Sequence, residues 1–187
     1  MAMLPTLPSA FVDPITGCPP RGEVEMSGLL GLFHQLGRVD WSKVRLSSVN
    51  GSVLTRTSND LFGGAVVCGE YQLSWDSESQ RNIWGSMPAD LIFLTRDGQS
   101  LALVENKIGS GFTGTGGDPV TGQLAKQADF LLHCRIPKTF LVLLSTAEYF
   151  SKGWYRNELS NALRHGDRSK KVSGYLMRWD DILLALR

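Results

Sequence analysis

The sequence has no long apolar run and very few cysteines, and both shortages limit what the chain can be. None of its 187 residues falls in an apolar stretch approaching the ~20 residues that a helix needs to cross a membrane. The first residues, MAMLPTLPSAFVDP, lack the basic start of a signal peptide and are interrupted by prolines. Cys18, Cys68 and Cys134 are odd in number and lack metal-ligand spacing, which favours thiols packed as small core side chains in a reducing compartment. We therefore expect a cytoplasmic protein without membrane association.

An excess of charge of one sign is also missing. The formal net charge is +1, so the chain as a whole has no basic signature of a nucleic-acid binder, and any basic surface must be local. Hydrophobic residues at 42% and charged residues at 20% are ordinary for a globular protein, and the length suits one domain. We expect residues 1–22, rich in Pro, Ser and Gly, to form an irregular arm, and residues 23–187 to form a single domain.

The most informative stretch is residues 88–107, PADLIFLTRDGQSLALVENK. Two short apolar runs flank an Asp-Gly turn, which is the pattern of a β-hairpin. In an antiparallel pair the start of one strand lies beside the end of the other, so Asp90 should lie near Glu105 and Lys107. Strand side chains alternate, so Glu105 and Lys107 share a face. Asn106 points the other way, which leaves its backbone carbonyl free to face the site.

Two carboxylates and one ammonium at the end of a buried hairpin are costly without partners. A divalent cation held between Asp90 and Glu105 would offset that cost, because hard cations prefer oxygen ligands. A structural salt bridge at the strand end is the competing explanation for the same residues.

A glycine-rich segment, residues 109–117, follows the hairpin and contains the spacing G-x-G-x-x-G. After a strand this spacing is also found in dinucleotide-binding proteins. Against that interpretation, the segment runs on before a helix can begin, it comes late in the chain, and the acidic Asp129 falls within the next helix. A glycine loop beside an active site and a plain flexible connection are the other two explanations.

The next helix is predicted to begin at Asp118-Pro119, an N-cap residue followed by proline. Leu124, Ala128 and Leu131 form its buried stripe, and Gln123 and Gln127 share a neighbouring face. The two glutamines are then either site residues or solvent-facing side chains.

Pro88-Ala89-Asp90, Glu105-Asn106-Lys107 and the helical Gln123 together resemble the PD-(D/E)xK nuclease superfamily. The resemblance implies an α/β fold with a restriction-endonuclease-like core, in which helices flank both faces of a central mixed β-sheet of about four to six strands. It implies that Asp90, Glu105 and the Asn106 carbonyl bind Mg²⁺, with Mn²⁺ able to substitute. Lys107 would position and activate the attacking water, and Gln123 would approach that water or the phosphate. RecB-like relatives carry a tyrosine four residues after this glutamine, where this chain has Gln127.

Two further acidic residues are candidates for the metal site. Glu25 is placed either to favour the dipole of a first helix or to support the metal, since some relatives have a glutamate on that helix. Glu70 lies within the strand predicted over residues 65–75, either on its solvated face or toward the metal.

Nucleic acid, most simply DNA, is the partner that the resemblance implies, and the oligomeric state stays open, with a homodimer as one option. Arg81 and Gln127 are candidate contacts. A basic stretch near the end of the chain either binds the phosphate backbone or forms a solvated face; its candidate residues are Lys152, Arg156, Arg164, Arg168, Lys170 and Lys171.

Periodicity predicts the remaining elements. A first helix should run from Glu23 to a stop at Gly37, with Leu29, Phe33 and Leu36 toward the core. Residues 43–57 form an accessory hairpin or a sheet edge, and residues 65–75 form the first core strand. The last part of the chain should contain a strand over 139–145 parallel to the hairpin, a helix over 152–165, a strand over 172–177 and a terminal helix beginning at Trp179.

The functional hypothesis is metal-dependent hydrolysis of phosphodiester bonds. The rival from another class is a non-catalytic nucleic-acid or protein-binding module that keeps the nuclease fold. The presence of Asp90, Glu105 and Lys107 together argues against that rival, because a site that has lost its catalytic activity need not keep all three residues.

Overall fold

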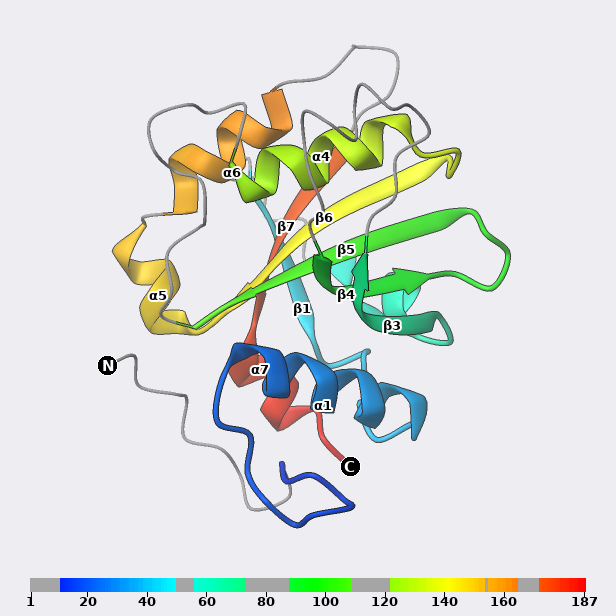
Figure 1. Cartoon of the computed structure of the whole chain (residues 1–187), viewed down its shortest axis with the longest axis vertical. Coiled ribbons are helices and arrows are strands. Elements are labelled where there is room, and N and C mark those ends of the chain that lie inside the picture. Colours follow the sequence, from blue (N-terminus) through cyan, green and yellow to red (C-terminus); the bar gives the residue numbers. More distant parts are fainter. Residues whose placement is uncertain (1–10, 50–55, 73–87, 109–121, 154, 165–171) are drawn as a thin grey trace.

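The computed structural model describes residues 11–49, 56–72, 88–108, 122–153, 155–164 and 172–187. A seven-stranded sheet runs through its middle, in the order β2-β1-β7-β6-β5-β4-β3 (Figure 1). The three central strands are β5 (Ser100–Lys107), β6 (Lys138–Ser145) and β7 (Val172–Arg178). They run parallel to one another, so the predicted parallel strand over 139–145 is confirmed.

The predicted hairpin is also confirmed. Its strands are β4 (Pro88–Leu94) and β5, which pair antiparallel with Leu91 opposite Val104 and Leu94 opposite Leu101. Gly98 in the connecting turn has φ 67°, a left-handed conformation that glycine adopts without steric cost. The hairpin is therefore closed at Gly98 and open at the end that carries Asp90 and Glu105.

Antiparallel strands complete the sheet at both edges. At one edge β3 (Val66–Gln72) pairs with β4, so the strand predicted over 65–75 lies at the rim of the sheet. At the other edge β1 (Arg45–Ser48) pairs with β7 and with the short β2 (Arg56–Thr57). The segment over 43–57 is thus both a hairpin and a sheet edge. The sheet is mixed as expected, and the two-residue β2 takes it one strand beyond the expected range.

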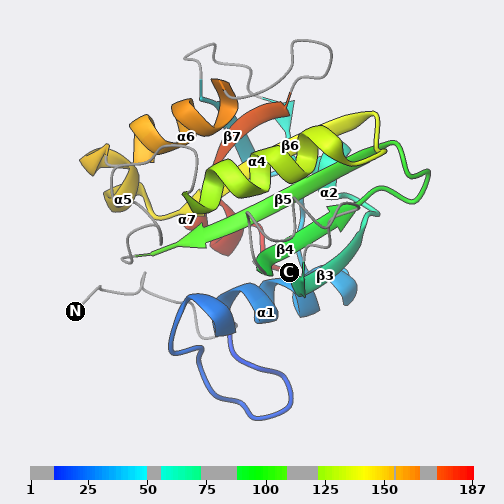
Figure 2. The ribbon, with the colours of Figure 1, turned by 45° about the horizontal axis from the view of Figure 1, so that its top comes forward.

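Helices cover both faces of the sheet, which confirms the α/β class (Figures 1 and 2). On one face lie α1 (Glu23–Gln35), α2 (Asn59–Phe62) and α7 (Trp179–Leu184). On the other lie α4 (Gln123–His133), α5 (Ala147–Lys152) and α6 (Tyr155–Arg164). Each face has its own apolar core, because the side chains of β5 and β6 alternate between the two layers.

Helix α1 differs in phase from the sequence prediction. Its most deeply buried side chains include Met26, Leu30 and Phe33, whereas Leu36 is 55% exposed at the C-cap. Leu29 is buried at the flank of the stripe. Gly37 follows with φ 67°, so the predicted stop is right and the assignment of Leu36 to the core is wrong.

The helix predicted over 152–165 corresponds to α6, and the sequence prediction missed the separate helix α5 before it. Gly153 ends α5 with φ 70°, a left-handed C-cap, and α6 begins at Tyr155. Thr146 starts α5 by accepting the Tyr149 backbone N–H on its hydroxyl at 3.1 Å.

Two smaller expectations need correction. Cys18 and Cys68 are exposed and Cys134 is half-buried, so the thiols do not fill the core. The arm is irregular over residues 11–22, yet the buried ring of Phe11 packs edge-on against Phe33 at 5.4 Å and Trp179 at 5.7 Å. Among the helices in the described residues, none combines the length and apolar character that crossing a bilayer requires.

Replacing Leu103 tests the packing of the site-bearing strand. Leu103 is fully buried on β5, so Leu103→Ala should lower the free energy of unfolding by about 2–5 kcal/mol in urea denaturation. Leu184→Ala is the matched control, because Leu184 is 81% exposed and its loss should change stability by less than about 0.5 kcal/mol. Equal effects of the two substitutions would contradict this packing.

Candidate functional site

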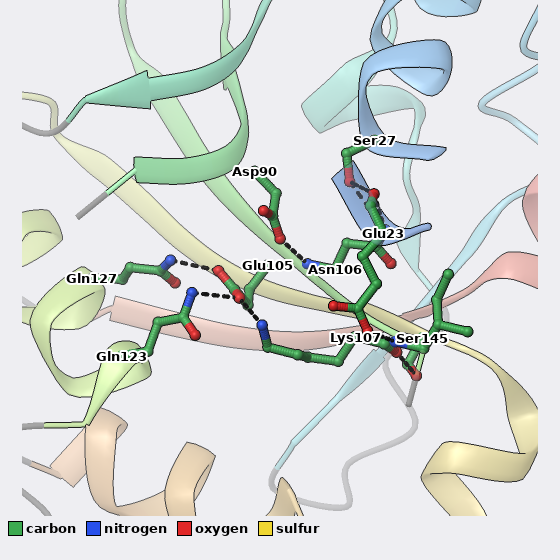
Figure 3. A network of polar contacts seen from close by, with 10 residues as sticks. Glu23, Ser27, Asp90, Glu105, Asn106, Lys107, Gln123, Gln127 and Ser145 are labelled. Carbon is green, nitrogen blue, oxygen red and sulfur yellow. Dashed lines mark hydrogen bonds and ion pairs between the residues drawn. The ribbon is translucent and has the colours of Figure 1, made fainter. Parts of the chain in front are cut away.

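The open end of the hairpin brings the predicted charged residues together. Continuing the β4–β5 register one step beyond Leu91 and Val104 puts Asp90 opposite Glu105. The Asp90 Oδ2 atom accepts the Asn106 backbone N–H at 2.7 Å, and the Lys107 Nζ atom lies 2.6 Å from Glu105 Oε1 (Figure 3). The predicted convergence of Asp90, Glu105 and Lys107 is confirmed.

The two glutamines of α4 hold the Glu105 carboxylate from above the sheet. Gln123 donates to Oε1 at 2.6 Å and Gln127 donates to Oε2 at 2.7 Å (Figure 3). Their spacing of four residues puts both amides on the same side of the helix, next to the buried stripe that packs on the sheet. Gln123 therefore contacts Glu105, and its approach to the attacking water or the phosphate stays a prediction.

Gln127 was also predicted to contact nucleic acid, and that prediction is wrong. Its side chain is fully buried, so it is shielded from a partner in solution. Its Oε1 atom has no hydrogen-bond partner among the described residues. The role that the structure gives Gln127 is to satisfy and orient Glu105.

Burial governs the protonation of the site. Desolvation, and next the negative charge of Asp90, raise the pKa of Glu105 from its ordinary value of 4.5 to about 7, against the opposing effect of Lys107. Desolvation likewise raises the pKa of Asp90, although the Asn106 N–H and Lys107 act against it. For Lys107, burial alone would lower the pKa, but the carboxylates of Glu105, Asp90 and Glu23 outweigh it and raise the pKa. Three carboxyl groups, those of Glu105, Asp90 and Glu23, thus lie around the Lys107 ammonium.

Glu23 is a site residue that sequence reasoning missed. It is the first residue of α1, and its Oε1 atom accepts the Ile108 backbone N–H at 2.5 Å. Its charge contributes to the raised pKa values of Asp90 and Lys107. The signal was present in the sequence: Glu23 stands three and seven residues before the buried Met26 and Leu30, which is the helical spacing of the core-facing stripe.

Glu25 was the acidic candidate on the first helix, and the structure places its side chain away from the site. Its exposed carboxylate accepts the Arg21 backbone N–H at 2.7 Å. It lines a cavity of about 470 Å³ between α1 and the irregular segment before it, together with Asp13 and Cys18. The metal-supporting role proposed for Glu25 is therefore wrong, and its place in the first turn of α1 fits the helix-dipole explanation.

Glu70 lies across from Asp90 on the edge strand. The flanking pairs, Gly69 with Leu91 and Tyr71 with Ala89, place it there, and its charge contributes to the raised pKa of Asp90. Glu70 is exposed and has φ 47°, a left-handed conformation that non-glycine residues rarely adopt. Glu70 thus lies next to Asp90 at the edge of the site and is exposed to solvent.

Tyr149 also belongs to the surroundings of the site. It is buried on α5, just after the end of β6, where Ser145 pairs with Lys107 and donates its hydroxyl to the Lys107 carbonyl. Burial, and next the charge of Glu23, raise the pKa of Tyr149 to about 12, so its phenol stays protonated. Tyr149 lies between the predicted strand over 139–145 and the predicted helix over 152–165, so the sequence pattern gave no signal for its role.

The candidate nucleic-acid contacts divide into two groups. Arg156 and Arg164 are exposed on α6, and Lys152 is exposed beside them but pairs with Glu148 at 2.9 Å. The other candidates lie outside the described residues, as do the glycine-rich segment 109–117 and the helix start at Asp118-Pro119; those candidates are Arg81, Arg168, Lys170 and Lys171.

The few oxygen ligands at this site suit Mg²⁺, which keeps several of its waters, better than a metal ion that takes all its ligands from the protein. Across the described ranges, no three His, Cys, Asp or Glu side chains form a ready cluster for a metal. Mg²⁺, however, usually keeps several waters and takes only one or two carboxylates. A carboxylate offers about four acceptor positions, and Lys107, Gln123 and Gln127 use three of those on Glu105.

The Asn106 carbonyl is placed to join those ligands. In a strand, the N–H and C=O of one residue point to the same side. Since the Asn106 N–H binds Asp90, its carbonyl also points toward the Asp90 side of β5. Asp90, Glu105 and this carbonyl therefore fit a water-rich Mg²⁺ site.

Comparison with known proteins adds no relative: no family model, no curated protein and no solved structure matches this chain. The function must therefore be argued from the geometry and electrostatics of the site.

The raised pKa of Glu105 predicts a pH dependence of stability in metal-free protein. The folded state holds a proton on Glu105 up to about pH 7, whereas the unfolded chain loses it near 4.5, so stability should fall as the pH rises through this window. Urea denaturation in EDTA at several pH values should show that Glu105→Gln flattens the fall. An unchanged slope in the Gln variant would show that Glu105 does not carry it.

Proposed function

We propose that the protein is a metal-dependent nuclease that hydrolyses phosphodiester bonds, with DNA as the expected substrate. The observation that carries the proposal is the convergence of Asp90, Glu105 and Lys107 at the open end of one hairpin, where Glu105 and Lys107 are buried and Asp90 is half-buried. A mixed sheet in which this antiparallel hairpin is followed by a helix and a parallel strand supports the restriction-endonuclease-like assignment.

In this proposal Asp90, Glu105 and the Asn106 carbonyl hold Mg²⁺, with Mn²⁺ as a substitute. The bound ion would supply a Lewis acid for the phosphoryl oxygen and lower the pKa of a coordinated water. Lys107, pinned on Glu105 at 2.6 Å with a raised pKa, stays protonated. As an ammonium it would orient the attacking water or stabilise developing negative charge.

The two glutamines then have different tasks. Gln127 is buried and fixes the Glu105 carboxylate. Gln123 is half-buried at the first turn of α4, so its amide can also face water or a phosphate oxygen. Exposed Arg156 and Arg164 lie on α6, which packs with α4 on the same face of the sheet, and would contact the phosphate backbone. Free thiols at Cys18 and Cys68 suit a reducing cytoplasm.

Lys107→Met tests the chemistry, because methionine keeps most of the length and removes the ammonium. Cleavage of plasmid, linear duplex, single-stranded DNA and RNA is followed with Mg²⁺, Mn²⁺ or EDTA. We expect cleavage only with metal, and about a 100- to 1,000-fold lower kcat in Lys107→Met. Asp90→Asn should abolish cleavage above the EDTA background, since it removes a metal ligand.

Lys43→Met is the matched control for that experiment. Lys43 is 64% exposed and pairs only with Asp40 at 3.5 Å among the described residues, so its loss should leave kcat unchanged. Intact substrates under every condition, combined with tight nucleic-acid binding, would overturn the enzyme and favour the non-catalytic module.

Arg156→Ala and Arg164→Ala test the phosphate-binding face. If each arginine contacts one phosphate, each substitution should weaken binding of all sequences similarly and reduce the salt dependence, the slope of log K against log salt, by about 1. The measurement is fluorescence anisotropy of labelled duplex over a salt series. Arg187→Ala serves as the control, because Arg187 is 64% exposed and pairs with Asp40 at 3.0 Å. A slope that is unchanged in both α6 variants would remove this face from the interface.

A further inference from the structure

Asn106 is the second-to-last residue of β5 and lies between Glu105 and Lys107, but its side chain points away from the site. It is fully buried on β5, on the face opposite Glu105 and Lys107. Both the nitrogen and the oxygen of its side-chain amide have hydrogen-bond partners. The Nδ2 atom donates to the Glu23 carbonyl at 3.0 Å and to Ser27 Oγ at 3.0 Å (Figure 3). The Oδ1 atom accepts the Trp179 indole N–H at 2.8 Å.

The same residue touches the site through its backbone. Its N–H donates to Asp90 Oδ2 at 2.7 Å, so one residue binds the Asp90 carboxylate with its main chain and the start of α1 with its amide. Glu23, whose carbonyl receives that amide, returns its carboxylate to the Ile108 N–H on the same strand. Ser27 closes the arrangement by donating to the Glu23 carbonyl at 2.9 Å.

Packing alone would not require an amide here. The neighbouring positions on this face of β5, Ala102 and Val104, are apolar, and Asn106 continues their alternation into the same core. A buried amide is costly unless all its groups are bonded, and it then specifies one arrangement of its partners. Here the partners are the first turn of α1, which carries Glu23, and the first residue of α7.

We infer that Asn106 is a positioning residue: its side chain fixes the start of α1 against β5, and this sets where Glu23 and Asp90 lie relative to Glu105 and Lys107. The inference rests on the proposed nuclease function for its catalytic consequence. Its structural part, the coupling of the amide to the Glu23 and Asp90 carboxylates, is independent of any activity.

Asn106→Asp is the primary test, because it keeps the shape and the acceptor for Trp179 while removing both donors. Residues that orient metal ligands typically contribute about 10- to 100-fold in metal affinity or activity. We expect a loss of that size in kcat, with a higher Mg²⁺ concentration for half-maximal rate and little change in KM for DNA. Nitrogen-edited NMR in EDTA should also show shifted amide signals at position 106 and Ile108.

A second pair of variants covers the case in which Asn106→Asp does not fold. Ser27→Ala and Trp179→Phe each remove one partner of the amide and add no charge, so each should shift the two amide signals and lower kcat by less than Asn106→Asp. Thr139→Val is the matched control: Thr139 is a buried polar residue on β6 whose hydroxyl lacks a hydrogen-bond partner within the described part of the chain. It should keep both kcat and the amide signals.

The outcomes separate the two proposals. Wild-type protein that never cleaves with metal would overturn the nuclease function, and the amide signals would still test the positioning role. If wild-type protein cleaves but the Asn106, Ser27 and Trp179 variants keep kcat, metal dependence and the Ile108 signal, the positioning role is wrong. Equal losses in Thr139→Val would show that any buried change on the sheet has the same effect.

Discussion

The burial of Glu105 beside Asp90 is the constraint on which the rest of this site depends. A carboxylate with no solvent exposure is expensive, and a second carboxylate next to it increases the cost. The fold meets part of that cost with Lys107 and with two amides from α4. The position of α4 follows from this requirement as well as from its apolar stripe, because only a helix in this place brings Gln123 and Gln127 to the two oxygens of one carboxylate.

Alternate side chains of β5 face the two helical layers on opposite sides of the sheet. Leu101 and Leu103 pack under α4 and lead to Glu105 and Lys107, whereas Ala102 and Val104 pack toward α1 and lead to Asn106. A register slip by one residue would exchange these faces and bury Asn106 against the glutamines. The Gly98 turn at one end, and the Asp90 contact to the Asn106 N–H at the other, both hold the register in which the charges face α4.

The hairpin and the parallel strand were predictable because their signals are local: an Asp-Gly turn between apolar runs, and a continuous apolar segment of strand length. From the hairpin alone, the meeting of Asp90, Glu105 and Lys107 followed by geometry. Glu23 and Tyr149 were not predicted, because their place depends on how α1 and α5 dock on the sheet, and a one-residue error in helix phase favoured Glu25. Gln127 was placed on the right helix, but sequence spacing could not distinguish a glutamine facing solvent from one facing a buried carboxylate.

Lys107 has more than one carboxyl group around it, and the proposed metal site depends on this feature. A salt bridge that only stabilises the fold needs one carboxylate for Lys107, and Glu105 at 2.6 Å already supplies it. Asp90 lies opposite Glu105, and its charge adds to the effect of burial in raising the pKa of Glu105 to about 7. Glu23 brings a third carboxyl group whose charge contributes to the raised pKa of Lys107. The proposed Mg²⁺ site, in which Asp90 and Glu105 are both ligands, would give the second carboxyl group a role that an ion pair with Lys107 does not.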